Sequence, residues 1–337
     1  MLRGQQGLTV LVVFYVTDSQ ISVIWVGRQG RFGCLLVDAG RFEIQYGCMT
    51  WSKGLAISVF AALVACGLAS VAGSASSEVL GIPMPLVCTL VIFAMQWLAF
   101  VPASLARTEH FYDLWGAVTY VVCVAMALFT TPLFGTGVRG LLVGALVVIW
   151  ALRLGAFLFL RVLATGGDGR FDKIKTSAPR FLVAWSLQGL WISATLLAAL
   201  ICIGEREPSA LGLVDALGTL FWVIGFAIES ISDEQKRRFR KSGSRDGFIS
   251  TGLWAWSRHP NYFGEILLWT GLAMIASTSM TGWEWLGLIS PLFVFALLRY
   301  GSGIPILEER ADQRFGHLPA YLEYRGKTPL LMLLPPQ

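Results

Sequence analysis

Long apolar blocks separated by short polar segments make up the chain from residue 54 onward. Most blocks are close to the length, roughly 20 residues, that a helix needs to cross the hydrocarbon core of a bilayer. Proline and glycine within the blocks do not exclude helices, because membrane helices tolerate both residues. The pattern predicts an all-α fold, a polytopic membrane helix bundle of about 7–8 transmembrane helices. The predicted spans cover residues 54–73, 81–106, 115–134, 138–161, 180–203, 211–230, 262–278 and 282–300.

Residues 1–48 have a different pattern. Their apolar run GLTVLVVFYV is short, and Asp18 interrupts its continuation toward ISVIWVG. The segment lacks the charged start and the small-residue cleavage site of a signal peptide. We interpret it as a poorly specified N-terminal extension, with Met49 as an alternative start, and an additional membrane segment is the second interpretation. Residues 49–330 then form a single membrane domain.

The distribution of positive charge predicts the topology. If alternate loops share a side of the membrane, one side holds eighteen Lys and Arg residues and the other side holds two. Cytoplasmic loops of membrane proteins carry such an excess. The basic loops are therefore predicted to face the cytoplasm, at the endoplasmic reticulum of a eukaryote or the plasma membrane of a bacterium. This topology explains the net charge of +5 without a nucleic-acid partner.

The cysteines and histidines do not indicate a metal site or a disulfide framework. The six cysteines include no CxxC pair, and most lie in apolar segments, where a free thiol behaves as a small hydrophobe. The three histidines are too far apart in sequence to suggest a set of metal ligands. We expect neither metal nor disulfides.

The stretch SRHPNYFGEILLW places polar side chains at the start of an apolar helix. Pro260 suits the first turn of a helix, where its missing N–H group costs nothing. Arg258 and His259 therefore lie at the positive N-terminal end of that helix, where phosphate or another anion can bind.

A polar stripe continues along this predicted helix. Arg258, Asn261, Tyr262 and Glu265 fall at positions i, i+3, i+4 and i+7. Anchoring at the membrane interface is an ordinary explanation for the arginine and the aromatic residues. It does not explain Glu265, which lies about one helical turn below the interface. We therefore predict that Asn261, the only asparagine of the chain, and Glu265 bind a ligand.

Other ionisable residues interrupt the apolar blocks. Glu229 and Asp233 are four residues apart and share a helix face. A basic stretch follows them, for which anionic lipid headgroups are the ordinary partner. Glu229 in the last turn of an apolar helix is costly unless it is paired or functional. Arg153, midway through an apolar block, needs an acidic partner or a water-filled cavity for the same reason, and Arg170 follows in the next basic loop.

Two further clusters lie on the same predicted face. The turn RTEHFYDLWG contains Glu109 and Tyr112, and the tail segment IPILEERADQRFGHLPAYLEYRGKTP contains Glu309, Arg310 and Tyr324. A solvated amphipathic helix explains the tail as well as a ligand site does. All clusters lie on or just inside the cytoplasmic face, within reach of a cytosolic anionic cofactor or substrate.

The segments GLWAWSRHPNYFGEILLW and SGIPILEERADQRFGHLPAYLEYRGKTP together resemble the C-terminal domain of the steroid 5-alpha-reductase family. RTEHFYDLWGAVTY, LRLGAFLFLR and GGDGRFD fit the DUF1295 branch of these membrane reductases, so the resemblance covers roughly residues 50–330. RHPNYFGE alone is less specific. It is shared with sterol C14/C7 reductases and, in a looser form, with isoprenylcysteine carboxyl methyltransferases.

The resemblance implies an NADPH-dependent reductase whose cofactor lies in a cavity of residues 229–327, open to the cytosol. In the family, the Asn and Glu of the NYFGE-like motif contact the cofactor, and an Asn-x-x-x-Asp pair on the preceding span also binds it. Asp233 matches that pair, whereas Glu229 departs from it. The residues expected to bind NADPH are Asn261, Glu265, Asp233, Glu229, Arg258, His259, Tyr262, Glu309, Arg310, Tyr324, Arg153 and Arg170.

The implied reaction is hydride transfer from NADPH to an activated C=C bond of a steroid-, sterol- or lipid-like substrate. Such chemistry needs a proton donor near the substrate carbonyl. Tyr112 and Glu109 are chemically suited to that catalytic role, although no motif assigns it to them. Two alternatives remain open: an S-adenosylmethionine-dependent methyltransferase of the isoprenylcysteine type, and a non-enzymatic lipid-binding membrane protein. We expect a lipophilic small-molecule substrate and no obligate protein partner.

Overall fold

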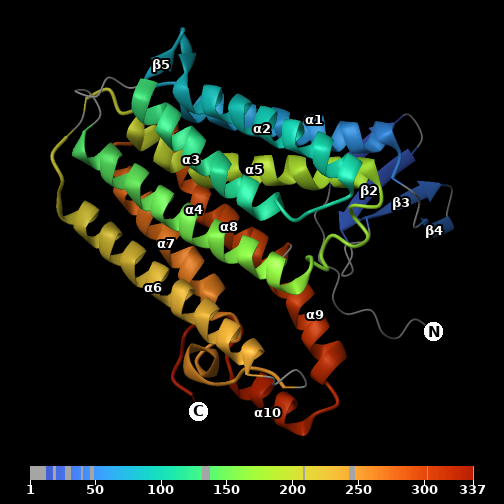
Figure 1. The fold of residues 1–337 in the computed structure, drawn as a ribbon. Helices are drawn as coiled ribbons and strands as arrows, with labels where there is room; N and C mark the ends of the chain where they lie inside the picture. The colour runs from blue at the N-terminus through green and yellow to red at the C-terminus, as the bar shows by residue number, and fades with distance from the viewer. Residues whose placement is uncertain are drawn as a thin grey trace. The chain divides into compact units, whose positions relative to one another are not determined.

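Helices occupy the apolar blocks in the computed structural model (Figure 1). It describes residues 13–17, 20–26, 32–38, 41–45, 49–130, 137–207, 209–242, 247–301 and 303–336. The α-helices are α1 (Trp51–Ala72), α2 (Met84–Ala106), α3 (Tyr112–Thr130), α4 (Val138–Thr165), α5 (Ala178–Ile203), α6 (Leu213–Lys241), α7 (Pro260–Ser277), α8 (Ile289–Tyr300), α9 (Ile304–Phe315) and α10 (Pro319–Lys327). Two 3₁₀ helices, η1 (Gly252–Ala255) and η2 (Gly282–Leu288), precede α7 and α8.

Seven helical segments of the described chain are long and apolar enough to cross a membrane. They are α1 to α6 and the segment Gly282–Phe315. The prediction of an all-α membrane bundle is confirmed, and this is an integral membrane protein. The predicted span 262–278 is the helix α7, whose first turns are polar, and it is not among the seven.

The chain divides into two compact units. The bundle unit comprises Met49–Ile231 and Asn261–Val294, and the terminal unit comprises Met1–Cys48, Ser232–Pro260 and Phe295–Gln337. The hydrophobic pattern predicts one domain over residues 49–330.

In the bundle unit, α5 forms the centre. It packs against α1, α2, α3 and α4, and Figure 1 shows these helices running side by side. Of the most apolar stretch of α5, 83% is buried, compared with 28–39% in the other candidate spans. The outer helices therefore present most of their apolar surface to lipid, whereas α5 is covered by protein.

Glycines allow α6 and α7 to approach each other closely. A Cβ atom added to Gly225 would lie 2.6 Å from the Gly264 carbonyl oxygen, and one added to Gly218 would lie 2.7 Å from that of Gly271. In each helix the two glycines are seven residues apart, so they lie on one face. Small residues permit such contacts between membrane helices. The contact between α6 and α7 places the backbone of Glu229 directly against Gly264. Gly264 immediately precedes Glu265 in the sequence.

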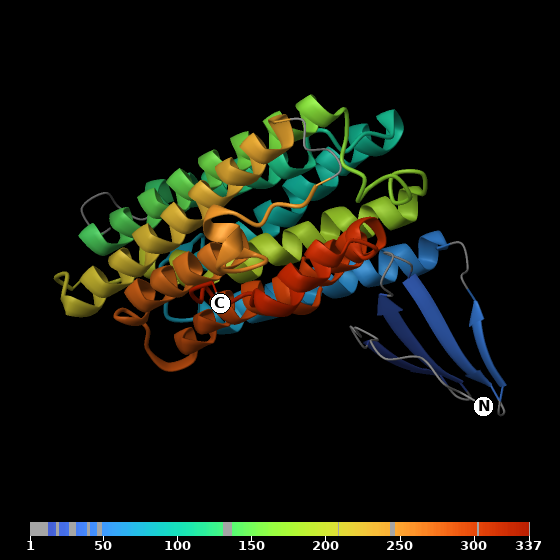
Figure 2. The same cartoon turned by 90° about the horizontal axis from the view of Figure 1, so that it is seen from below.

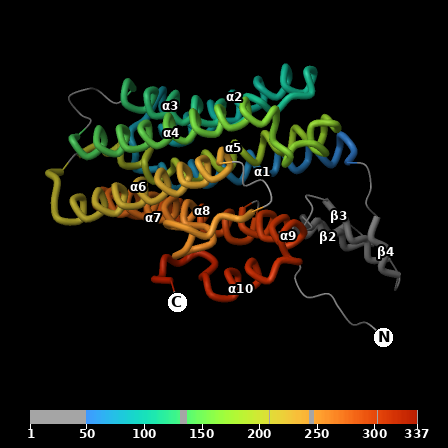
Figure 3. The backbone as a smooth tube through the Cα atoms, turned by 60° about the horizontal axis from the view of Figure 1, so that its bottom comes forward, coloured from blue at the N-terminus to red at the C-terminus, as the bar shows by residue number. Residues whose placement is uncertain are grey.

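The terminal unit contains α9, α10 and the segments that precede them. Figure 3 shows α10 beside α9, where the Tyr321 hydroxyl donates to Asp312 at 3.0 Å. The Tyr324 hydroxyl donates to the carbonyl oxygen of Trp254 at 2.7 Å. The tail also pairs with the segment before α7, since the Arg258 amide donates to the Pro329 carbonyl at 2.9 Å.

Four strands precede the helices. β1 (Val13–Thr17), β2 (Gln20–Val26), β3 (Phe32–Asp38) and β4 (Arg41–Gln45) form an antiparallel sheet in the order β1-β2-β3-β4 (Figure 2). The sequence analysis did not predict these strands. The rest of the predicted extension 1–48 lies outside the described residues. Between α1 and α2, β5 (Glu78–Val79) and β6 (Ile82–Pro83) form a short hairpin whose turn residues Leu80 and Gly81 have positive φ angles.

We expect the substitution Gly264→Ala to destabilise the bundle unit. The added methyl group would lie 2.6 Å from the Glu229 amide nitrogen, and backbone atoms of a packed helix cannot move aside cheaply. Such overpacking costs about 1–3 kcal/mol. The measurement is the Tm of purified protein in detergent. Gly67→Ala in α1 is the matched control, because no atom lies within 4 Å of its added Cβ. Equal Tm values for the two variants would contradict the packing described for α6 and α7.

Candidate functional site

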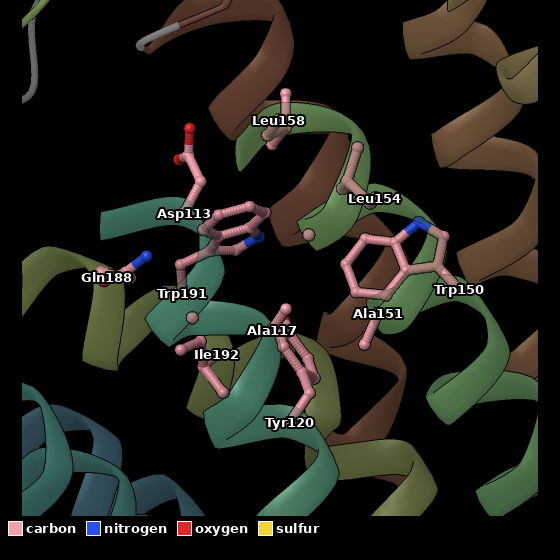
Figure 4. Close-up of a pocket in the computed structure, with 12 residues that line it drawn as sticks. Asp113, Ala117, Tyr120, Trp150, Ala151, Leu154, Leu158, Gln188, Trp191 and Ile192 are labelled. Carbon is pink, nitrogen blue, oxygen red and sulfur yellow. The ribbon is translucent and has the colours of Figure 1, made fainter. Parts of the chain in front are cut away.

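A narrow cavity lies between α3, α4 and α5 of the bundle unit (Figure 4). We call it the bundle cavity. It encloses about 340 Å³ including its open side, of which about 30 Å³ admits the centre of a water molecule. Its lining is mostly apolar, as expected for a site that takes a lipophilic molecule. The lining residues are Asp113, Gly116, Ala117, Tyr120, Trp150, Ala151, Leu154, Gly155, Leu158, Gln188, Trp191 and Ile192.

Aromatic side chains close one end of the bundle cavity. Trp150 makes edge contacts with Tyr120 and with Trp269 of α7, at centroid distances of 5.2 and 5.0 Å. The Tyr120 hydroxyl is hydrogen-bonded to Thr195 of α5. Glu265 of α7 is close enough to Tyr120 to interact with it electrostatically. The predicted ligand residue Glu265 therefore lies near this aromatic end.

Two buried polar groups of the cavity lining lack hydrogen-bond partners among the described residues. They are the side-chain carbonyl oxygen of Gln188 and the indole N–H of Trp150. The amide group of Gln188 donates to the Tyr112 carbonyl oxygen at 3.0 Å, which fixes the orientation of the side chain. Leaving such groups unsatisfied costs about 1–3 kcal/mol each. An acceptor and a donor are thus available to a ligand with a polar oxygen.

Asp113 links the cavity lining to a network of charged residues in the loop after α4. Arg170 bridges Asp113 at 3.1 Å and Asp168 at 2.7 Å, and Arg161 also contacts Asp168 at 3.1 Å. Burial raises the pKa of Asp168, but its bonds to Arg170 outweigh that effect and the pKa is lowered. Tyr262, a predicted ligand residue, interacts electrostatically with Arg170. The network therefore keeps Asp168 ionised.

The two residues predicted to be catalytic lie beside this network. The Tyr112 hydroxyl donates to the Ala184 carbonyl oxygen at 2.8 Å, and its ring packs against Phe171. Glu109 is buried, pairs with Lys175 at 2.7 Å and accepts the Asp168 amide at 2.9 Å. Burial raises the pKa of Glu109, but these bonds outweigh it and the pKa is lowered. An ionised Glu109 is a poor proton donor at neutral pH.

Arg153 has the acidic partner that its position requires. It forms an ion pair with Glu229 across α4 and α6, and its guanidinium group lies 5.5 Å from the Phe226 ring centroid. Glu229 is 2% exposed. The structure therefore brings together two of the predicted cofactor residues, and their pairing explains why each charge is tolerated within a span.

The terminal unit contains a second, larger cavity, which we call the terminal cavity. About 430 Å³ of it admits the centre of a water molecule, within the range of roughly 300–1,000 Å³ typical of small-molecule sites. Basic and aromatic side chains dominate its lining. The lining residues are Lys236, Phe239, Arg240, Gly247, Phe248, Ile249, Trp254, Arg258, His259, Leu307, Glu308, Ala311, Arg314, Phe315, Tyr321 and Tyr324.

Arg258 and His259 both bind Glu308 of α9. Arg258 forms an ion pair with one carboxylate oxygen, and His259 Nε2 lies 2.8 Å from the other. Burial lowers the pKa of His259, and the hydrogen bond to Glu308 only partly opposes that effect. The imidazole ring is therefore neutral at pH 7 and donates through Nε2. The formal charge of this cluster comes from Arg258 and Glu308.

Aromatic rings form one wall of the terminal cavity. The ring of Phe248 lies 5.3 Å from both Tyr321 and Tyr324, and 6.0 Å from Phe315. Burial raises the pKa of Tyr324, so its hydroxyl group stays protonated. Flat rings beside cationic groups are suited to a ligand that combines an aromatic base with phosphates.

The helix face of α9 that lines the cavity differs from the predicted one. Sequence analysis selected Glu309 and Arg310, but the cavity is lined by Glu308 and Arg314. Glu309 instead accepts a hydrogen bond from Gln313 at 3.4 Å. The expected cofactor roles of Glu309 and Arg310 stay predictions without a contact to this cavity.

The remaining predicted residues divide between the units. Asp233 is buried in the terminal unit, whereas Asn261 is half-buried at the start of the bundle unit's part of α7.

Sequence reasoning missed Tyr120 and Gln188 as site residues. A polar side chain within an apolar span was the available signal for both. Lys236 and Arg240 belong to the basic stretch for which the sequence predicts lipid headgroups as partners, and both residues line the terminal cavity.

Comparison with known proteins gives a family for most of the chain. Residues 99–328 match the family described as "Protein of unknown function (DUF1295)". The 3-oxo-5-alpha-steroid 4-dehydrogenase 1 of Bos taurus is 37% identical over 82 residues, which are 24% of this chain and 30% of the bovine protein. The Schizosaccharomyces pombe protein C7D4.09c is 26% identical over 148 residues, 44% of this chain and 53% of its own length. The chain thus spans about half, or less, of these curated relatives, and no solved structure matches it.

We expect Lys175→Met to lower the stability of the protein at neutral pH by about 1–3 kcal/mol, because it leaves the buried Glu109 carboxylate without its cation. The pKa of Glu109 is below its ordinary value of 4.5, so the pair stabilises the fold above about that pH. This stability is lost as the pH falls through the lowered pKa. The Tm difference between wild type and variant should therefore shrink from pH 7 toward pH 4. Lys173→Met, at an exposed position in the same loop, is the control. A difference that does not change with pH would contradict this role of Glu109.

Proposed function

The chain belongs to the DUF1295 family, and from this membership and its two cavities we propose that the protein is an NADPH-dependent membrane reductase. The proposed reaction transfers a hydride to an activated C=C bond of a steroid-, sterol- or lipid-like substrate. The partial similarity to a steroid 4-dehydrogenase supports this class of reaction. The observation that carries the proposal is the terminal cavity, with its basic groups and its aromatic wall.

The chemistry of the terminal cavity fits NADPH. Its lining carries four permanent cations, Lys236, Arg240, Arg258 and Arg314, and one acid, Glu308. A dinucleotide with a pyrophosphate and a 2′-phosphate group requires such an excess of positive charge. The rings around Phe248 offer a stacking surface for adenine. When bound, NADPH supplies the hydride of the reaction.

The same charge argument separates the proposed function from a methyltransferase. S-adenosylmethionine carries a sulfonium cation and no phosphate, so a lining with four cations and one carboxylate is poorly matched to it. A non-enzymatic protein that binds anionic lipid headgroups would use the basic groups of this cavity but not its aromatic wall. Both alternatives therefore explain the terminal cavity less well than a reductase does.

The bundle cavity is the proposed site of the substrate. Its apolar lining suits a ring system or an acyl chain. The indole N–H of Trp150 suits a substrate carbonyl oxygen, and the carbonyl oxygen of Gln188 suits a substrate hydroxyl group. Because little of the cavity admits even water, substrate entry requires side chains such as Leu154 and Leu158 to move. Exclusion of water protects a hydride transfer from side reactions.

The proposed proton donor is Tyr120 rather than the earlier candidates. Its hydroxyl lies at the aromatic end of the bundle cavity, whereas Glu109 is held ionised by Lys175. Tyr120 is 3% exposed, and an ordinary phenol is protonated at neutral pH. In this role Tyr120 exchanges its bond to Thr195 for one to the substrate carbonyl. The proton then goes to the enolate formed by hydride addition.

The predicted residues of the bundle unit have supporting roles in this proposal. Asn261 and Glu265 at the start of α7 keep their proposed role as residues that bind the cofactor. The Arg153–Glu229 pair and the glycine contact between α6 and α7 hold the backbone around Glu265 in place. The cofactor is proposed to come from the cytoplasm, because eighteen of the twenty loop cations counted lie on that predicted side.

The first test is NADPH binding by the purified full chain in detergent. We expect saturable binding, and about tenfold weaker binding for Arg314→Gln, which removes one cation from the cavity lining. Arg238→Gln is the control, because this arginine is exposed and pairs with Glu234 instead of lining the cavity. Absence of saturable NADPH binding, together with saturable binding of S-adenosylmethionine, would reverse the assignment in favour of a methyltransferase.

The second test compares two phenylalanine substitutions. Tyr120→Phe should lower kcat for reduction of a steroid enone by about 10²–10⁴-fold, because it removes the proton donor. NADPH affinity should not change, since Tyr120 does not line the terminal cavity. Tyr112→Phe should cost less activity, because the hydroxyl it removes is bonded to the Ala184 backbone. A larger loss of kcat for Tyr112→Phe than for Tyr120→Phe would contradict the role of Tyr120 and support Tyr112, the residue predicted from the sequence, as the proton donor.

A further inference from the structure

Glu308 is the only acidic side chain in the described lining of the terminal cavity. It lies on α9, within a set of four permanent cations, and its side chain is 19% exposed. A single carboxylate in a strongly basic cavity requires an explanation, because it reduces the attraction of the cavity for anions.

Glu308 occupies the donors that a phosphate group would use. One of its oxygens is bonded to Arg258, and the other accepts from His259 Nε2 at 2.8 Å. An arginine and a neutral imidazole N–H are ordinary donors to phosphate oxygens. The two carboxylate oxygens therefore stand where two phosphate oxygens could bind.

Arg258 also has a hydrogen-bond donor that Glu308 does not use. Its Nε–H is buried and has no acceptor among the described residues, whereas Nη1 binds Glu308. A guanidinium group presents its donors as a planar fork that can bind two acceptor atoms at once. The observed pairing is thus incomplete, and a ligand that brings more acceptor oxygens can satisfy it better.

We infer that Glu308 is an internal competitor of the anionic ligand of the terminal cavity. Binding of a phosphate group displaces the Glu308 carboxylate from Arg258 and His259 and takes over both donors. The site then selects for ligands of high negative charge, because a weakly charged ligand gains too little to displace the carboxylate. This inference rests on the proposed function only for the identity of the ligand.

A competing role and a positioning role of Glu308 predict opposite effects on anion binding when the charge of Glu308 is removed. If Glu308 only held Arg258 and His259 in place, removing its charge would weaken the binding of anions. If Glu308 competes, removing its charge strengthens binding, because one repulsive charge is lost and both donors are released. The direction of the change therefore decides between the two roles.

The experiment measures binding of inorganic pyrophosphate to the purified full chain in detergent, by titration calorimetry at constant ionic strength. Glu308→Gln keeps the size of the side chain and removes its charge. We expect the Kd of this variant to be about tenfold lower than that of wild type, as loss of one nearby like charge in a partly solvated site implies. Glu323→Gln is the control for net charge, because Glu323 is exposed on α10 and pairs with Lys327. It should bind as wild type does.

The outcomes distinguish this inference from the proposed function. Unchanged or weaker pyrophosphate binding by Glu308→Gln would overturn the competing role, even if NADPH binds to wild type. Tighter pyrophosphate binding by Glu308→Gln, with no NADPH binding to either protein, would support the competing role of Glu308 and contradict the proposed reductase function. Because loss of the ion pair can also destabilise the fold, Glu308→Asp serves as a second variant. It keeps the charge on a shorter side chain, and it should not show the tenfold gain.

Discussion

The ion pair between Arg153 and Glu229 is the constraint on which the arrangement of the bundle unit depends. An unpaired charge at the centre of a membrane helix, such as that of Arg153, costs about 2.5–3.5 kcal/mol on insertion scales, and pairing with Glu229 offsets this cost. The pair fixes α4 against α6. The glycine contact then fixes α7 against α6, and it does so at Glu229 itself. Trp150 and Glu265, on the helices that are joined in this way, both lie beside Tyr120.

The two cavities have complementary chemistry. The bundle cavity is apolar and narrow, with two isolated polar groups, whereas the terminal cavity is wide and basic. The proposed reductase would need both kinds of site, one for a lipophilic substrate and one for a charged cofactor. A single cavity could not serve both ligands well, because charges that bind phosphates would penalise the burial of an apolar substrate.

Other buried charges of the bundle unit are paired with opposite charges. Arg139, one of two cations counted in the predicted outer loops, is 2% exposed and bonds Asp215 at 2.8 Å and Glu205 at 3.3 Å. Glu109 and Asp168 are likewise fixed by Lys175 and Arg170. In these clusters each buried charge has an opposite charge as its neighbour, as burial of ions requires. The lining of the terminal cavity holds four permanent cations and one acid, and this composition is what makes it a candidate site for an anionic ligand.

The sequence alone determined the helical membrane fold, because block length and apolarity are local properties of the chain. It also located Arg258 and His259 in a cluster that lines a cavity, and it required a partner for Arg153. It could not name Glu229 as that partner, since the two residues are 76 positions apart and only packing brings α4 to α6. It could not show which face of α9 lines the terminal cavity, because tertiary contacts set the rotation of the helix about its axis. Glu308 and Arg314 line that cavity, and the roles of Glu309 and Arg310 stay predictions from the resemblance. Tyr120 and Gln188 gain their significance from the space between three helices, and no local pattern encodes that space.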